Sequence, residues 1–361
     1  MLFRLAGTVE SITAERPGIQ EIQVRTDSGP RNAVNYPPLT GEVSEGDSVV
    51  LNICGVAMGL GSGGWDIVAS VSRDSETREP PGHIIKLRYT PLQFPVLAAE
   101  SPESSHHDLI GSFQSLEGTP VVCAEIHSQV AAIAAAVKWE TDSHARTSYI
   151  QTEGGALPLS FSRLIAGLKE KELLDATISC GQAFGGDFEA VNLYSALAVA
   201  DSVAHADVII VCQGPGAAGT GTPLGFSGVE QGTALNAVSS LGGTPVAVVR
   251  MSEADPRPRH RGVSHHTVTI LQRIALCRAL VPVPRPTRRV GSAWRNVMEG
   301  TGIAERHDVI TVDVEPAMEA LATHKDLFST MGRSLEEDRT FFEAAVAAGL
   351  VAGQWTSGVR S

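Results

Sequence analysis

The chain has few aromatic residues, no long apolar run and no cysteine pattern typical of disulfides. Aromatic residues make up 5% of the 361 residues, so the core must be built from Val, Leu, Ile and Ala, which suits parallel strands covered by helices. No apolar run approaches the roughly 20 residues that span a bilayer, and the N-terminus turns polar too early for a signal peptide. The five cysteines are scattered, which favours buried thiols. We therefore expect a cytoplasmic protein with no membrane partner.

The negative net charge of −12 is unevenly distributed. Ten arginines lie between Arg250 and Arg295 against two acids, Glu253 and Asp255, so this segment carries +8 and the rest of the chain −20. A cationic segment in an anionic protein indicates an anionic partner, although a solvated face paired with acids elsewhere is an equally good interpretation. A nucleic acid is disfavoured, because Trp294 is the one aromatic residue of the segment that can stack on bases.

The pattern of apolar runs divides the chain into two domains. Residues 1–90 contain short runs rich in Val and Ile, at 2–9, 21–26, 32–36, 48–52 and 66–71, which predict a small β-barrel or sandwich. Residues 91–118 are expected to form a linker and entry segment. Residues 119–361 are expected to form an α/β domain that ends in a helix at 335–350.

Strands and helices are expected to alternate in the α/β domain. Apolar runs predict strands at 120–126, 147–151, 176–180, 207–212, 245–249 and 309–314. Helices are predicted from Ser128, where the serine can cap, and at 159–171, 187–204, 229–241 and 266–280. This rhythm predicts a parallel sheet with helices on both faces, in which a ligand binds beyond the carboxyl ends of the strands.

The first candidate binding loop follows the strand at 176–180. Glycines between a strand and a helix can present backbone N–H groups to an anion, and Asp187 is placed to cap the helix. A tight connection that needs positive φ is the competing interpretation. Cys180, at the strand exit, is a candidate nucleophile, but a buried thiol is the more common case. The candidate ligand-binding residues of this loop are Gly181, Gln182, Gly185, Gly186 and Asp187.

The second candidate loop, residues 214–228, contains a formal G-x-G-x-x-G. Its candidate ligand-binding residues are Gly214, Gly216, Gly219 and Thr220. A dinucleotide site is disfavoured because no helix opens at once and the next strand ends in Arg250 rather than an acid. Arg250 suits a 2′-phosphate, so an NADP-binding oxidoreductase remains a lesser alternative. No P-loop lysine follows.

The third loop, residues 250–266, carries the strongest functional signal. Arginine presents bidentate donors to phosphate or carboxylate, which makes ligand-binding candidates of Arg250, Arg257, Arg259 and Arg261. Histidine supplies acid–base chemistry near neutral pH, so proton-transfer candidates are His260, His265 and His266, with Ser264 as the expected cap of the following helix. These histidines are metal-ligand types, but no HExxH, CxxC or HxH spacing is present, and the sequence predicts no metal.

Several stretches of the chain also resemble a known family. They are YPPLTGEVSEGDSVVLN (36–52), GLGSGGWDIV (59–68), GHIIKLRYTPLQ (82–93), GGALPL (154–159) and GQAFGGDFEAVN (181–192). Together they resemble an uncharacterised domain-of-unknown-function family of Actinobacteria and Firmicutes, over most of the chain. The resemblance implies a bacterial cytoplasmic protein. It carries no activity, cofactor or catalytic residue.

The residues together favour a site for a small anionic ligand, phosphorylated or nucleotide-like, at the strand ends of the α/β domain. The histidines would transfer protons if the protein is an enzyme, which the sequence leaves open, as it does the identity of any cofactor. The alternative is a non-enzymatic binding or assembly protein. A homo-oligomer, most simply a homodimer, is expected in either case.

Overall fold

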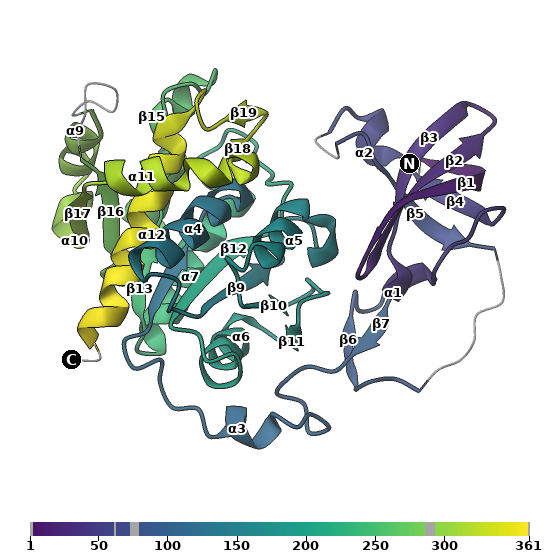
Figure 1. The fold of residues 1–361 in the computed structure, drawn as a ribbon, viewed down its shortest axis with the longest axis horizontal. Coiled ribbons are helices and arrows are strands. Elements are labelled where there is room, and N and C mark those ends of the chain that lie inside the picture. Colours follow the sequence, from purple (N-terminus) through teal and green to yellow (C-terminus); the bar gives the residue numbers. More distant parts are fainter. Residues whose placement is uncertain (1–2, 61–62, 73–78, 286–292, 360–361) are drawn as a thin grey trace. The chain divides into compact units, whose positions relative to one another are not determined.

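The computed structural model describes residues 3–60, 63–72, 79–285 and 293–359. The chain forms two compact units, Met1–Leu97 and Ala98–Ser361. Both parts of the expected fold class are confirmed: an all-β unit comes first, and a parallel α/β unit follows (Figure 1). Every helix in the described part of the chain is too short or too polar to cross a membrane.

The first unit is a closed five-stranded barrel in the order β1-β2-β3-β5-β4. Register shifts in β1 bend this long strand, and valine, isoleucine and leucine side chains fill the interior. Closure leaves no exposed edge in this sheet. The strands are β1 (Arg4–Arg16), β2 (Ile19–Thr26), β3 (Gly29–Asn35), β4 (Ser48–Asn52) and β5 (Asp66–Val71), with short helices α1 (Pro37–Thr40) and α2 (Cys54–Ala57) and the hairpin β6 (Ile84–Lys86) and β7 (Phe94–Val96).

The second unit contains an eight-stranded parallel sheet in the order β11-β10-β9-β12-β8-β13-β16-β17. Successive residues of its central strands point to opposite faces, so Val122 lies in one core layer and Val121 in the other. The strands are β8 (Pro120–Cys123), β9 (Thr147–Thr152), β10 (Ala176–Cys180), β11 (Phe188–Ala190), β12 (Val208–Gln213), β13 (Thr244–Ala247), β16 (Leu280–Pro284) and β17 (Asp308–Val312).

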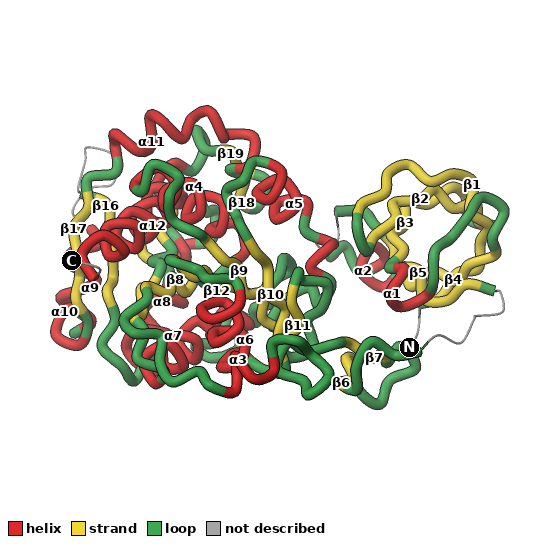
Figure 2. The backbone as a smooth tube through the Cα atoms, turned by 60° about the horizontal axis from the view of Figure 1, so that its bottom comes forward, coloured by secondary structure: helices red, strands yellow, loops and turns green. Residues whose placement is uncertain are grey.

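Helices cover both faces of this sheet (Figure 2). One face packs against α4 (Val130–Glu140), α5 (Arg163–Glu170), α11 (Glu315–Leu321) and α12 (Arg339–Val359), and α12 lies along α4. The other face packs against α6 (Leu193–Ala198), α7 (Glu230–Ser240), α9 (Ala293–Gly300) and α10 (Ile303–Arg306). The remaining helices and strands of the unit are α3 (His107–Gly111), α8 (His265–Thr269), β14 (Met251–Ser252), β15 (Gly262–Val263), β18 (Ser329–Thr330) and β19 (Arg333–Ser334).

The expected helix at 187–204 is wrong in its first part. Asp187 caps no helix, because its Oδ2 accepts hydrogen bonds from the backbone N–H and the hydroxyl of Thr177, each within 2.9 Å. Strand β11 follows, and α6 begins only at Leu193, where the Asn192 side chain is the cap. Ser128 is likewise no cap, since its hydroxyl lies 3.0 Å from that of Thr330.

The expected helix at 266–280 is also too long. Helix α8 ends at Thr269, one π-helical turn follows at Ile270–Ile274, and β16 begins at Leu280. The expected C-terminal helix at 335–350 starts four residues later than predicted and continues to Val359. The expected cap Ser264 is confirmed, because its side chain accepts a hydrogen bond from the backbone of His266. All five cysteines are free thiols, as expected.

Candidate functional site

The candidate site lies beyond the carboxyl ends of β8 and β13, two neighbouring strands near the centre of the sheet. Glu125 follows β8 and Arg250 follows β13, and Arg250 Nη1 lies 2.8 Å from Glu125 Oε1. Their side chains are only 1% and 5% exposed. Burial acts to raise the pKa of Glu125, but the hydrogen bond from His266 and the nearby Arg250 guanidinium outweigh it and lower the pKa. Glu125 is therefore a buried carboxylate held ionised by its partners.

His266, in the first turn of α8, is fixed on three sides. Its Nδ1 lies 2.6 Å from Glu125 Oε1, its backbone N–H donates to the Ser264 hydroxyl, and its ring stacks on Phe226 with centroids 3.7 Å apart and planes at 4°. An ionised carboxylate only accepts hydrogen bonds, so Nδ1 of His266 carries a proton. The residues around His266 thus set its orientation.

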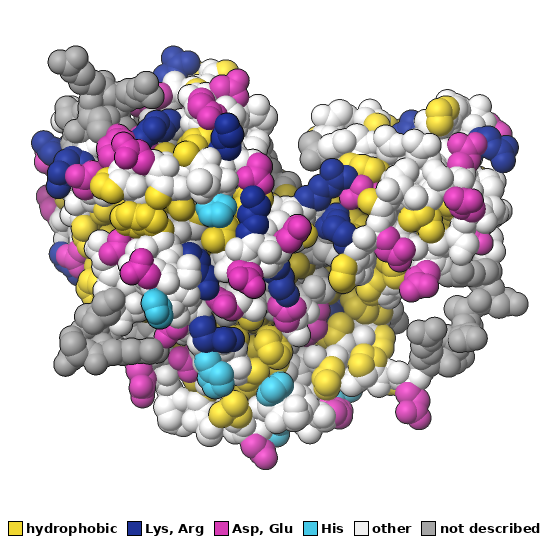
Figure 3. All heavy atoms as spheres, viewed as in Figure 1, with side chains coloured by type: hydrophobic (Ala, Val, Ile, Leu, Met, Phe, Trp, Pro, Cys, Tyr) yellow, Lys and Arg dark blue, Asp and Glu magenta, His cyan; other side chains and the backbone are white. Residues whose placement is uncertain are grey.

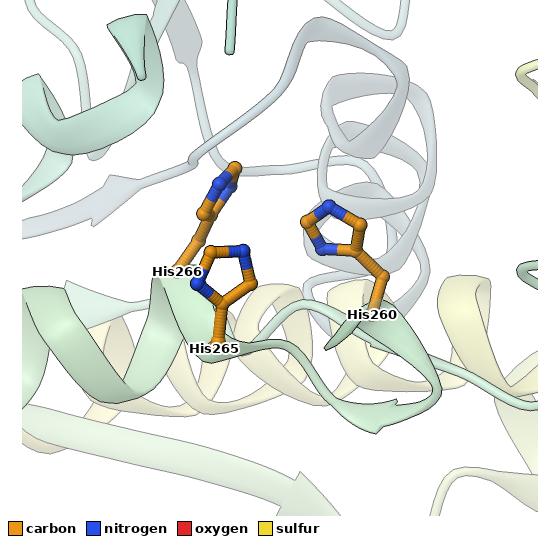
Figure 4. Close-up of side chains that lie close together, drawn as sticks. All are labelled: His260, His265 and His266. Atoms are coloured by element: carbon orange, nitrogen blue, oxygen red, sulfur yellow. The ribbon is translucent and has the colours of Figure 1, made fainter. Parts of the chain in front are cut away.

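His260 and His265 lie beside His266 (Figure 4). His260 ends a 3₁₀ turn at Pro258–His260, and its Nδ1 lies 2.8 Å from the Ser264 hydroxyl. The ring centroids are 4.4 to 5.1 Å apart, and one ligand atom from each ring lies within 4.8 Å of the others. We call these three residues the histidine cluster.

Burial and neighbouring cations keep two of these histidines, His260 and His265, uncharged. Burial, with the charges of Arg250 and Arg257, lowers the pKa of His260 to about 3. Burial also lowers the pKa of His265, helped by His266. At neutral pH these two imidazoles are therefore uncharged, and each has one nitrogen with a lone pair. Within the described residues, the buried Nε2 of His265 has no hydrogen-bond partner.

The arginines of this loop fall into two groups. Arg250 is paired with Glu125, and Arg257 donates hydrogen bonds to both carboxylate oxygens of Asp255 at 2.8 and 2.9 Å. These hydrogen bonds lower the pKa of Asp255 well below its usual range. Arg259 and Arg261 are exposed; Arg261 reaches only the Asp255 carbonyl at 3.5 Å, and Arg259 makes no ion pair within the described residues. Two of the four candidate arginines are therefore already neutralised inside the protein.

The segment's positive charge is neutralised elsewhere too. Arg278 pairs with Asp308 and Arg285 with Asp313. Figure 3 accordingly shows basic and acidic side chains interspersed over the visible face of the second unit. On this face, the arginines of the described residues do not gather into one basic surface.

The 214–228 loop reaches the histidine cluster through its far end, where Phe226 stacks on His266. Gly214, at the start of this loop, leaves room for the loop that follows β9. A Cβ on Gly214 would lie 2.3 Å from the Ala156 carbonyl, and a Cβ on Gly155 would lie 2.2 Å from the Gly214 carbonyl. These two glycines allow the backbones of the loops after β9 and β12 to come into contact. Gly216 and Gly219 lie between the two ends of this loop. The Thr220 hydroxyl donates a hydrogen bond to the Gly225 carbonyl.

The G-x-G-x-x-G of this loop lacks the helix that such a fingerprint needs. The next helix, α7, starts only at Glu230, after a 3₁₀ turn at Ser227–Val229. A pyrophosphate at these glycines would therefore meet no helix N-terminus.

The 181–187 loop lies at the same edge of the sheet but away from the cluster. Three strands separate β10 from β13, and at about 4.8 Å per strand their ends are roughly 19 Å apart. The loop's N–H groups already have partners: Gln182 donates to Glu153, Gly185 to Glu189 and Gly186 to the Ser179 hydroxyl.

The other candidates of this loop are held in the same way. Gly181 adopts a positive φ of 64°, Asp187 is bonded by Thr177 and Lys169, and Cys180 is buried with its Sγ 3.6 Å from the Gln151 carbonyl. The structure does not bring these residues to the histidine cluster.

The sequence did not single out Glu125 and Phe226, although both position the candidate site. The available signal was an acid directly after the apolar run VVCA, where a charge must be buried. His127 also follows β8, and its Nε2 lies 2.7 Å from the Ser162 hydroxyl. Burial lowers the pKa of His127 to about 4.

Comparison with known proteins gives a family and no activity. No curated protein matches the chain. The family model for a protein of unknown function, DUF3866, matches residues 32–349. This match confirms the family expected from the sequence motifs. The chain therefore belongs to the DUF3866 family of proteins of unknown function.

Proposed function

We infer that the edge formed by the ends of β8 and β13 binds a small anionic ligand, phosphorylated or nucleotide-like. The observation that carries this proposal is the position of two exposed arginines, Arg259 and Arg261, on the loop that holds the histidine cluster. The charge of Arg259 acts on His265. Exposed guanidinium groups next to uncharged imidazoles offer donors for an oxyanion.

The buried pair beneath the cluster supports the same proposal. Burying Glu125 and Arg250 costs free energy that an apolar pair of the same size would not cost. Perturbed charges of this kind gather at functional sites. Here they fix the ring of His266, and a ligand at the carboxyl ends of parallel strands would meet that ring.

Binding is favoured over proton transfer as the primary role. An imidazole whose pKa is held at about 3, as in His260, is a weak base at neutral pH. Proton transfer by the three histidines stays a prediction, as do a cytoplasmic location and a homodimer.

Thermal unfolding of the intact chain with inorganic phosphate, a nucleoside monophosphate and a hexose phosphate tests the proposal. An anion at 100 times its Kd stabilises the folded state by about 2.7 kcal/mol, so the Tm of the wild-type chain should rise by several degrees. The R259A/R261A variant should lose this rise. R273A removes an exposed arginine of the same segment, in the turn after α8, and should keep it. An absence of any shift, or equal shifts in all three chains, contradicts the proposal.

A further inference from the structure

We propose that His260, His265 and His266 together form a binding site for one divalent transition-metal ion, with Zn²⁺ as the preferred ion. The three rings face one another at the start of α8 (Figure 4). The proposal goes beyond anion binding, because the metal needs neither Arg259 nor Arg261. The sequence predicted no metal since none of the usual ligand spacings is present.

In two of the rings Nδ1 already has a hydrogen-bond partner, so Nε2 is the nitrogen left for a metal. His266 donates its Nδ1–H to the Glu125 carboxylate at 2.6 Å, and the His260 Nδ1 lies 2.8 Å from the Ser264 hydroxyl. A metal at Nε2 requires a proton on Nδ1, which the Glu125 carboxylate accepts from His266 and the Ser264 hydroxyl can accept from His260. Metal-binding histidines usually donate their other ring N–H to a carboxylate, a carbonyl or a similar acceptor, which fixes the ring for the metal.

His265 supplies an independent sign of a missing ligand. Its Nε2 is buried and has no hydrogen-bond partner within the described residues. Buried polar atoms are nearly always satisfied, and a core histidine cluster would pair its nitrogens with one another or with the backbone. An ion at the centre of the cluster would satisfy this nitrogen together with the two Nε2 atoms of the neighbouring rings.

The distances suit a metal after small side-chain rotations. Zn–N bonds of about 2.0–2.1 Å in a tetrahedral site require nitrogens about 3.3 Å apart, and the candidate ligand atoms lie within 4.8 Å of one another. Imidazole ligands suit Zn²⁺ and its transition-metal neighbours better than Mg²⁺ or Ca²⁺.

Three protein ligands leave the fourth position of a tetrahedral ion open. An open position is typical of catalytic rather than structural zinc sites. A phosphate or carboxylate oxygen that took this position would lie beside the exposed Arg259 and Arg261. The metal and the proposed anion site are therefore compatible, but each can be tested without the other.

The experiment uses the full-length untagged chain, stripped with a chelator and then titrated with Zn²⁺ against a chromophoric competitor. Elemental analysis should find one zinc per chain. The H265A and H260A variants should lose affinity by on the order of 100-fold or more, because each loses one of three ligands. Co²⁺ should give the visible absorption of a tetrahedral site in the wild type only. H265Q serves as the second variant if H265A does not fold.

H107A is the matched control, because His107 is an exposed histidine of the same unit and forms a vicinal pair with His106. It should bind Zn²⁺ as the wild type does. A chain without a saturable site, or an H107A loss equal to that of H265A, overturns the proposal. R259A/R261A should keep its zinc affinity, so a failure of anion binding and a failure of the metal site are distinguishable.

Discussion

Replacing Arg250 by methionine tests whether the buried pair beneath the histidine cluster is held by its mutual charge. Methionine keeps most of the side-chain volume but leaves Glu125, 1% exposed, without its guanidinium. Breaking a buried ion pair costs about 3–5 kcal/mol, because one charge stays buried and uncompensated. His266 still contacts the same carboxylate at 2.6 Å, so we expect R250M to lose stability near the lower end of this range.

The double variant E125Q/R250M separates a lost attraction from an uncompensated charge. It removes both charges, so its free energy of unfolding should recover to within about 1–2 kcal/mol of the wild type. A simple addition of two independent losses would instead make it the least stable chain of the set. Because the two side chains form a buried ion pair, the double variant should lose less stability than the sum of the two single losses.

Urea unfolding followed by tryptophan fluorescence measures the cycle. Three of the four tryptophans, Trp139, Trp294 and Trp355, lie in the second unit, and a W65F background confines the signal to it. R273A should stay within about 0.5 kcal/mol of the parent, as exposed substitutions do. The reasoning is refuted if R250M costs under about 1 kcal/mol or if the double variant is no more stable than R250M.

Two further predictions concern other parts of the second unit. G155A should lower the free energy of unfolding by about 1–3 kcal/mol, because its Cβ would lie 2.2 Å from the Gly214 carbonyl. The control G219A, whose Cβ would have its nearest neighbour at 3.8 Å, should stay within about 0.5 kcal/mol of the wild type. Equal urea midpoints for the two variants would contradict this prediction. His127 has a folded pKa of about 4 and an unfolded pKa of about 6.5. The unfolded state therefore binds the proton first, and about 3 kcal/mol of stability is lost as the pH falls from about 6.5 to 4. H127Q should lack this part of the pH dependence, and an unchanged slope would speak against a buried neutral His127.

Local patterns predicted most of the fold. The expected strands at 48–52 and 66–71 coincide with β4 and β5, because short apolar runs rich in Val and Ile are bounded there by turn residues. Strand β16 escaped prediction, because its sequence LVPVP contains two prolines, which argue against a central strand. The prolines limit pairing on the β13 side, where β16 pairs only at Leu280, before Pro282, whereas β16 pairs with β17 along its whole length.

The misplaced helix at 187–204 has a tertiary cause. Its sequence has a plausible cap in Asp187, but that carboxylate accepts hydrogen bonds from Thr177 and Lys169, which belong to neighbouring elements. A side chain with two competing sets of donors cannot be assigned from its own segment. The real cap, Asn192, is five residues further along.

The candidate site was predictable in its place but not in its chemistry. The sequence marked residues 250–266 by their charge and histidines, and the structure gathers those histidines at one sheet edge. Charge, however, is a poor guide to a ligand, because Glu125 is 125 residues from Arg250 in the chain and cancels it in space. A ligand is indicated instead by atoms that the fold leaves without partners. The His265 Nε2 is such an atom, and nothing in the sequence around it predicts that the fold leaves it without a partner.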